Sequence, residues 1–248
     1  MSKYIISLFS ILLLSFTIYT NIRTIQTPHI DSPAKVYERG KAQSPINLEI
    51  ALSADLDDIK FHYNSHQFDI INTGHATQLS PSKSDKSKEN YIIIDGEKYD
   101  LVQFHFHSPS EHLIQNKFYP MEVHFVHINK DGNLAVVGIL VNKGALNKEF
   151  KKIISKIPTE KNKKVELTEE IYIQELMPKD KRDYRYIGSL TTEPYTEGVK
   201  WHVIKEPIEF SEEQINAIKK IMNKPNARPV QELNKRKVVF DSTINKPN

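Results

Sequence analysis

The chain has 248 residues, of which 39% are hydrophobic and 26% are charged, and its net charge at pH 7 is +3. This length and composition support a sizeable apolar core and exclude a disordered protein. The small net charge, with lysines spread along the chain, gives no basis for nucleic-acid binding. Because the sequence has no cysteine, disulfides are excluded and any metal site must use His, Asp or Glu ligands.

The N-terminal segment has the layout of a secretory signal. Lys3 precedes an apolar run from about Tyr4 to Tyr19, as in the charged and apolar regions of a signal peptide. The run is short for a membrane span, and no small-residue cleavage site follows it. Residues 1–25 are therefore interpreted as a signal peptide or an N-terminal membrane anchor. Residues 26–248 are interpreted as one exported domain, periplasmic or extracellular.

Short apolar runs broken by Gly, Pro, Asn, Asp or Ser predict a predominantly β domain after this segment. The clearest strands are residues 68–74, 91–95, 99–107, 121–129 and 133–142. The last two form the clearest hairpin, with Asp131-Gly132 at its turn. Helical spacing of apolar residues predicts helices within 146–157 and 211–222. In the second helix, Ser211 and Gln214 fit a capping box.

Five of the 10 histidines lie between positions 105 and 127. Side chains alternate between the two faces of a strand, so His105 and His107 share one face while Phe104 and Phe106 point to the other. If this strand pairs with the strand that carries His124, three imidazoles converge. Three imidazoles suit Zn²⁺ and leave a fourth position for water, which is the arrangement of catalytic zinc sites.

A ligand histidine also needs an acceptor for its second ring nitrogen. Gln103 lies two residues before His105, and Glu122 lies two residues before His124. Each acceptor therefore lies on the same face of its strand as its histidine. Any one of these histidines alone is more typical of a hydrogen-bonded core residue, but the combined pattern favours zinc. The other histidines of the cluster, His112 and His127, are interpreted as structural.

A series of motifs in chain order resembles the α-class carbonic anhydrases, in particular their exported bacterial members. The motifs are AQSPINL (42–48), NTGH (72–75), QFHFHSPSEH (103–112), MEVHFVHIN (121–129), LAVVGIL (134–140), GSLTTEPYTEGVKW (188–201) and NARPVQELNKR (226–236). The resemblance implies a mixed, largely antiparallel, twisted central sheet with a few short peripheral helices. It also implies reversible hydration of CO₂ to bicarbonate and a proton by zinc-bound hydroxide.

Residue-by-residue matching implies a zinc site and its supporting acceptors. The zinc ligands are His105, His107 and His124, and the acceptors behind them are Gln103, Glu122 and the backbone carbonyl of Asn226. The substrate is the small molecule CO₂ or bicarbonate. The oligomeric state stays open, a homodimer included, as does a membrane tether through the N-terminal segment.

The resemblance further implies three catalytic residues and a substrate pocket. Thr191 orients the attacking hydroxide through a hydrogen bond to Glu111, and His75 carries protons between the cavity and bulk solvent, because histidine titrates near neutral pH. Thr192 helps to hold bicarbonate. The apolar wall of the CO₂ pocket comprises Val126, Val136, Leu190 and Trp201.

The chain departs from the family pattern near its N-terminus. Many exported members join the region before QSPIN to the region after SLTT by a disulfide, and the matching positions here are Tyr37 and Tyr195. We expect the two segments to lie side by side still, with these aromatic residues in contact. Trp201 is the only tryptophan in the sequence, so the aromatic N-terminal stretch of the family has no counterpart.

Two alternative functions remain at this stage. A carbonic-anhydrase-like binding or adhesion protein would keep the fold, but such relatives generally lack one of the zinc histidines, and all three are present here. A zinc hydrolase of another fold is the second alternative. A metalloprotease of the H-E-x-x-H type is disfavoured because that motif is absent.

Overall fold

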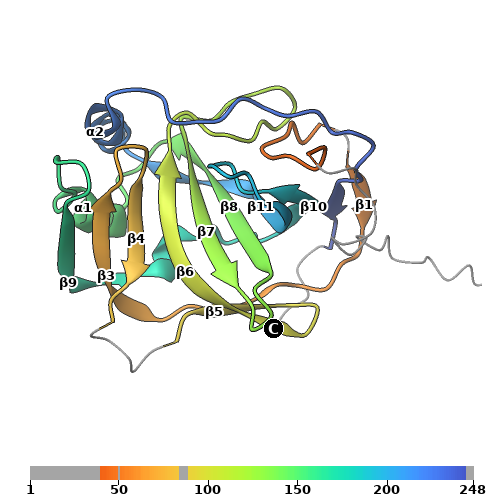
Figure 1. The fold of residues 1–248 in the computed structure, drawn as a ribbon, viewed down its shortest axis with the longest axis horizontal. Helices are drawn as coiled ribbons and strands as arrows, with labels where there is room; N and C mark the ends of the chain where they lie inside the picture. Colours follow the sequence, from red (N-terminus) through yellow and green to blue (C-terminus); the bar gives the residue numbers. More distant parts are fainter. Residues whose placement is uncertain (1–39, 50, 84–88, 244–248) are drawn as a thin grey trace, which may run out of the picture.

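A computed structural model describes residues 40–49, 51–83 and 89–243, which form one strongly twisted sheet with helices at its margin (Figure 1). The predicted leader, residues 1–25, and Tyr37 lie outside these residues. Within the described part of the chain, no helix is long and apolar enough to cross a membrane.

The sheet contains 12 strands over the described residues, in the order β1-β12-β10-β11-β8-β7-β6-β4-β3-β9, while β5 pairs with β6 and β2 pairs with β5. The strands are β1 (Leu52–Ala54), β2 (Lys60–His62), β3 (Ser65–Asn72), β4 (Thr77–Pro81), β5 (Tyr91–Ile94), β6 (Glu97–His107), β7 (Met121–Ile128), β8 (Leu134–Lys143), β9 (Lys164–Tyr172), β10 (Asp183–Ser189), β11 (Glu197–Phe210) and β12 (Val239–Asp241). Among these strands, β1 pairs with β12 and β8 pairs with β11 in parallel, and the other pairs are antiparallel. The predicted mixed, largely antiparallel sheet is confirmed.

Each of the five predicted strand segments forms a strand, and the predicted hairpin joins β7 to β8. Its turn contains Gly132, with φ +84°, while Asp131 keeps an ordinary negative φ. The side chain of Asn129 accepts hydrogen bonds from the N–H groups of Asp131 and Asn133. The turn therefore depends on one glycine and on an asparagine that satisfies two backbone donors.

The helices are α1 (Lys148–Ile154), a 3₁₀ turn η1 (Ile173–Leu176) and α2 (Glu212–Met222). The predicted capping box is present, since the Ser211 hydroxyl accepts from the N–H of Gln214 and the Gln214 side chain accepts from the N–H of Ser211. Gln214 also exchanges two hydrogen bonds with the backbone of Asn147, the residue that caps α1. The starts of the two helices are therefore fixed to each other.

Side chains of the central strands divide between two apolar clusters. The larger cluster contains Phe104 and Phe106 and is covered by α1 and α2 through residues such as Phe150. The smaller cluster lies on the opposite face and includes Val136 and Trp201. The alternation of strand side chains puts the predicted metal-binding histidines on the same face as the smaller cluster.

Candidate metal centre and cavity

The pairing of β6 with β7 brings the three predicted histidines together. His105 lies directly opposite His124, and His107 lies opposite Glu122. The ring centroids are 4.9 Å apart for His105 and His107, 5.3 Å for His105 and His124, and 4.6 Å for His107 and His124. One nitrogen from each ring lies within 4.8 Å of the other two, close enough for a single metal ion to bind all three.

The second nitrogen of each ring on β6 is held by an oxygen. Nδ1 of His105 lies 2.9 Å from Oε1 of Gln103, and Nδ1 of His107 lies 3.2 Å from the carbonyl oxygen of Asn226. An amide or carbonyl oxygen can only accept, so Nδ1 carries the proton and Nε2 keeps its lone pair. Nε2 of His107 is buried and has no hydrogen-bond partner. A buried ring nitrogen without a partner destabilises the folded protein, because its lone pair has lost its hydrogen bond to water. A metal ion bound to this lone pair would remove that cost.

The third histidine is held by the buried carboxylate of Glu122. One of its oxygens accepts from Nε2 of His124 at 2.8 Å and from Nδ1 of His112 at 2.7 Å. The other accepts from the backbone N–H groups of Glu111 and His112. Burial would raise the pKa of Glu122, but the two histidines outweigh it and hold the pKa well below its usual range. The free lone pair of His124 is therefore on Nδ1.

His112 has a structural role, as expected, because both of its ring nitrogens form buried hydrogen bonds. One of these hydrogen bonds links it to Glu122 and so to the candidate metal centre. Its Nε2 lies 2.7 Å from the hydroxyl of Tyr186, which lies 2.8 Å from the hydroxyl of Ser44. Because Nδ1 of His112 donates to Glu122, Nε2 accepts from Tyr186. The position of Glu122 is thus fixed by a chain of buried hydrogen bonds.

Burial also determines the charge of the three histidines. It lowers the pKa of His107 to about 4, and it lowers the pKa values of His105 and His124 as well, against the opposing charge of Glu122. All three rings are neutral near pH 7, so each presents a lone pair. Three neutral imidazoles with held outer nitrogens are the donor set of a catalytic zinc site, and the residues fit that metal.

Glu111 lies beside these rings. One carboxyl oxygen is 3.5 Å from Nδ1 of His107 and accepts the N–H of Arg228 at 2.7 Å. Burial raises the pKa of Glu111, while the nearby His124, the Arg228 N–H and the neighbouring Thr191 side chain act in the opposite direction. The other carboxyl oxygen lies 3.8 Å from Nδ1 of His124 and is buried without a hydrogen-bond partner among the described residues. The pairing of Thr191 with Glu111 stays a prediction.

A cavity of about 700 Å³ opens beside this centre. Six predicted site residues line it: His75, Gln103, His105, Thr191, Thr192 and Asn226. The ring of His75, which is exposed, lies 6.5 Å from that of His107. The predicted CO₂-wall residues lie in or against the smaller apolar cluster: Val126, Val136, Leu190 and Trp201. That cluster adjoins the cavity, since Val126 pairs with Gln103.

Two further residues of this site were not found from the sequence. At Gly138, which pairs with His124, a Cβ atom would lie only 2.9 Å from the carboxylate of Glu122. Arg228 supplies its backbone N–H to Glu111. Neither role leaves a signal in residue spacing, because one depends on a missing side chain and the other on a backbone atom.

The region that replaces the family disulfide can be described in part. Glu197 accepts the N–H groups of Gly40 and Ala42, and it also accepts from the side chain of Gln43. The expected proximity of these two segments therefore holds for the described residues. Among them, Tyr195 has the guanidinium of Arg228 over its ring, 3.8 Å from the centroid.

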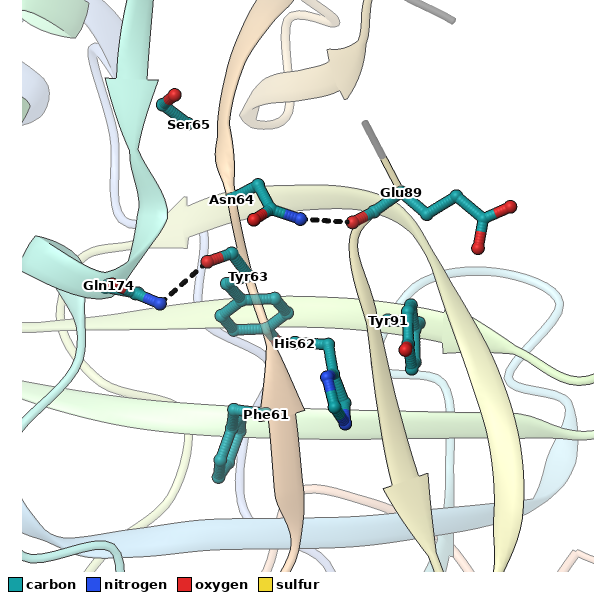
Figure 2. Close-up of a pocket in the computed structure, with 8 residues that line it drawn as sticks. All are labelled: Phe61, His62, Tyr63, Asn64, Ser65, Glu89, Tyr91 and Gln174. Atoms are coloured by element: carbon teal, nitrogen blue, oxygen red, sulfur yellow. Dashed lines mark hydrogen bonds between the residues drawn. The ribbon is translucent and has the colours of Figure 1, made fainter. Parts of the chain in front are cut away.

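A second cavity, of about 540 Å³, lies near β2 and the start of β5 (Figure 2). Its side-chain amides are already bound to the backbone, since Asn64 donates to the carbonyl of Glu89 and Gln174 donates to that of Tyr63. None of the predicted site residues lines it. Of the two cavities, only the first is lined by predicted site residues.

A twisted β-sheet that carries three converging neutral histidines beside a cavity offers a candidate metal site of the type found in metalloenzymes. The family is identified by sequence, because the profile of the eukaryotic-type carbonic anhydrases matches residues 33–242. The chain belongs to the carbonic anhydrase family and is an enzyme of that family.

The similar proteins include bacterial members. A carbonic anhydrase of Pectobacterium atrosepticum is 39% identical over 202 residues, which are 82% of this chain and 81% of the relative. The solved α-carbonic anhydrase of Thermovibrio ammonificans, in complex with the inhibitor sulfanilamide, is 42% identical with a TM-score of 0.76, covering 81% of this chain and 87% of that one. A hyperthermostable carbonic anhydrase from a hydrothermal vent chimney is 44% identical with a TM-score of 0.76, covering 81% and 88%.

Replacing Gly138 by alanine is expected to weaken zinc binding by about 10- to 100-fold, because the new Cβ displaces the Glu122 carboxylate that holds His124. Competition with a chelator measures the affinity. Gly144→Ala is the matched control, since its Cβ meets only the flexible end of the exposed Glu209 side chain. Equal zinc affinity in the two variants would contradict the role of Glu122.

The metal-free protein is expected to lose stability as the pH falls from about 6.5, where an unfolded histidine titrates, to about 4. His107 has a depressed pKa in the folded state, so the unfolded chain takes up the proton first. The contribution of His107 to the free energy of unfolding is fully present above about pH 6.5. By about pH 4, about 3 kcal/mol of that free energy is lost. Denaturant unfolding of chelated wild type and His107→Gln measures this difference. Identical pH dependence in both proteins contradicts the assignment.

Proposed function

We propose that this protein catalyses the reversible hydration of CO₂ to bicarbonate and a proton in a zinc-dependent reaction. The observation that carries the proposal is the convergence of three neutral imidazoles, each with its outer nitrogen held, beside an open cavity. Membership of the carbonic anhydrase family supports the same reaction.

The metal would be held by Nε2 of His105, Nε2 of His107 and Nδ1 of His124, the nitrogens that keep their lone pairs. Bound zinc supplies Lewis acidity that lowers the pKa of a coordinated water, a role established for carbonic anhydrases in general. Gln103, Glu122 and the Asn226 carbonyl fix the tautomers. The ligands are therefore oriented before any metal arrives, and little reorganisation accompanies binding.

Thr191 and Glu111 would orient the attacking oxygen. A threonine hydroxyl that donates its proton to Glu111 presents only lone pairs to the cavity. It therefore accepts a hydrogen bond from a group that carries a proton, and it disfavours ligands that cannot donate. Thr192, which lines the same cavity, would donate to an oxygen of bicarbonate.

The apolar wall would hold CO₂ next to this point. Val126, Val136 and Trp201 are buried, and Leu190 packs against their cluster. CO₂ has no net dipole, so it gains little from charged groups and loses little when it leaves water. A dry wall also keeps water from competing for the position of the substrate.

His75 would carry the released proton to bulk solvent. It is exposed and lines the cavity, and its carbonyl is held by the side chain of Asn226. Its ring lies 6.5 Å from that of His107, so water in the cavity would carry the proton from the reacting site to His75.

We further infer that residues 1–25 serve as a signal peptide or membrane anchor and that residues 26–248 form the exported enzyme. The support is the charged and apolar layout of the leader. The product would then form in the periplasm or outside the cell.

Stopped-flow CO₂ hydration tests the proposed reaction. We expect activity in the zinc-loaded protein, loss of activity after chelation, and recovery when zinc is returned. His107→Ala is expected to bind zinc poorly and to be inactive. His62→Ala, which changes an exposed histidine on the second cavity, is the matched control. A folded wild type that holds one zinc and has no activity would favour a carbonic-anhydrase-like binding protein.

His75→Ala is expected to lower kcat by about tenfold or more in weak buffer, because proton removal then depends on solvent alone. The value of kcat/KM for CO₂ should stay close to wild type, since the proton leaves after the substrate has reacted. Imidazole buffer should restore part of kcat. An unchanged kcat in weak buffer rules out His75 as the proton carrier.

A further inference from the structure

Tyr195 is held in a backbone conformation that tyrosine disfavours. Its φ is +59°, in the left-handed region where glycine and asparagine are common. Its N–H donates to the carbonyl of Thr192 at 2.8 Å, which closes the turn directly after the two cavity threonines. A strained residue of this kind persists where its surroundings fix it, and such positions cluster at functional sites.

The fixing contact is made by Arg228. Its guanidinium lies 3.8 Å from the centroid of the Tyr195 ring. The same guanidinium donates to the Gln43 side chain at 2.9 Å and to the carbonyl of Ser44 at 2.7 Å. The side chain of Gln43 in turn donates to the carbonyl of Tyr195 at 3.3 Å. Tyr195, Arg228 and Gln43 therefore form a closed group that joins three segments far apart in the sequence.

The backbone of Arg228 connects this group to the site. Its N–H donates to Glu111 at 2.7 Å. Two residues earlier, the carbonyl of Asn226 accepts from His107, and the side chain of Asn226 accepts from the N–H of Ser108. The segment 226–228 therefore sets the positions of one candidate ligand and of the carboxyl group that faces Thr191.

We propose that Tyr195 is a positioning residue. Its ring holds the Arg228 side chain so that the Arg228 N–H stays on Glu111, and Glu111 in turn aligns the Thr191 hydroxyl. The inference rests on the proposed CO₂ hydration for its kinetic consequence, but the contact itself can be tested without it.

Tyr195→Leu removes the aromatic face and is expected to lower kcat and kcat/KM together by about three- to tenfold, the factor that a cation–π contact of this kind supports. KM should change little, because the apolar substrate wall is untouched and the lost alignment acts in the transition state. Tyr195→Phe keeps the face and should retain wild-type kinetics.

The variant Tyr195→Gly tests whether Tyr195 affects turnover independently of its effect on protein stability. Glycine adopts the left-handed conformation without strain, so the melting temperature should stay level or rise while kcat falls as in Tyr195→Leu. A residue with a merely structural role would lose stability and turnover together.

Amide hydrogen exchange, measured by NMR on the chelated protein, gives a readout that needs no activity. The Arg228 N–H should exchange several-fold faster in Tyr195→Leu and Tyr195→Gly than in wild type and Tyr195→Phe. Tyr172→Leu is the matched control, since Tyr172 is an exposed tyrosine on β9 with Lys152 over its ring at 5.3 Å. It should leave both kinetics and Arg228 exchange unchanged.

Wild-type kcat and wild-type Arg228 exchange in Tyr195→Leu would overturn the proposal, as would a Tyr195→Phe variant as damaged as Tyr195→Leu. An inactive wild-type protein would defeat the proposed function instead. In that case Arg228 exchange still decides whether Tyr195 holds the contact with Glu111.

Discussion

The antiparallel register between β6 and β7 is the constraint on which the site depends. His105 faces His124 in this register, and the neighbouring pair, Phe104 and Phe125, stacks on the other face with ring centroids 5.1 Å apart. Both phenylalanines are fully buried in the larger core. A slip of one residue would drive the imidazoles into that apolar core without hydrogen-bond partners and turn the aromatic rings onto the polar face. Ordinary apolar packing on one face therefore sets the geometry of the polar face.

The same register buries a full negative charge, which is stable only because its hydrogen bonds are complete. Glu122 accepts from two imidazoles and two backbone N–H groups, and the absence of a side chain at Gly138 leaves room for it. An unpaired carboxylate at this depth would take up a proton. A protonated Glu122 would present a donor to His124 and would reverse the tautomer that leaves Nδ1 free. The tautomer of His124 that leaves Nδ1 free for a metal therefore depends on Glu122 staying ionised.

The predictable parts of this protein are those governed by local periodicity. Strand β6 and most of β7 alternate polar and apolar side chains, and β8 is a continuous apolar run. Their existence and the shared face of His105 and His107 therefore follow from local pattern alone. The acceptor of His107 is a carbonyl at Asn226, 119 residues away, on a loop without periodicity, and only family resemblance indicated it. Gly138 and Arg228 act through a missing Cβ atom and a backbone N–H, which residue type does not reveal. The bounds of β9 to β12 likewise depend on tertiary pairing more than on pattern.

The cavity rim is assembled from loops, and without cysteine these loops are joined only by non-covalent contacts. The carboxylate of Glu197 ties the segment that begins at Gly40 to the start of β11 by accepting two N–H groups and the Gln43 amide. Burial acts against the ionised form, but the hydrogen bonds outweigh it and lower the pKa of Glu197. The Ser44 and Ser189 hydroxyls each accept the other residue's N–H, which adds a second link. Unlike a disulfide, these links stabilise the folded state without constraining the unfolded chain, so the order of the rim depends on hydrogen bonds that exist only in the folded protein.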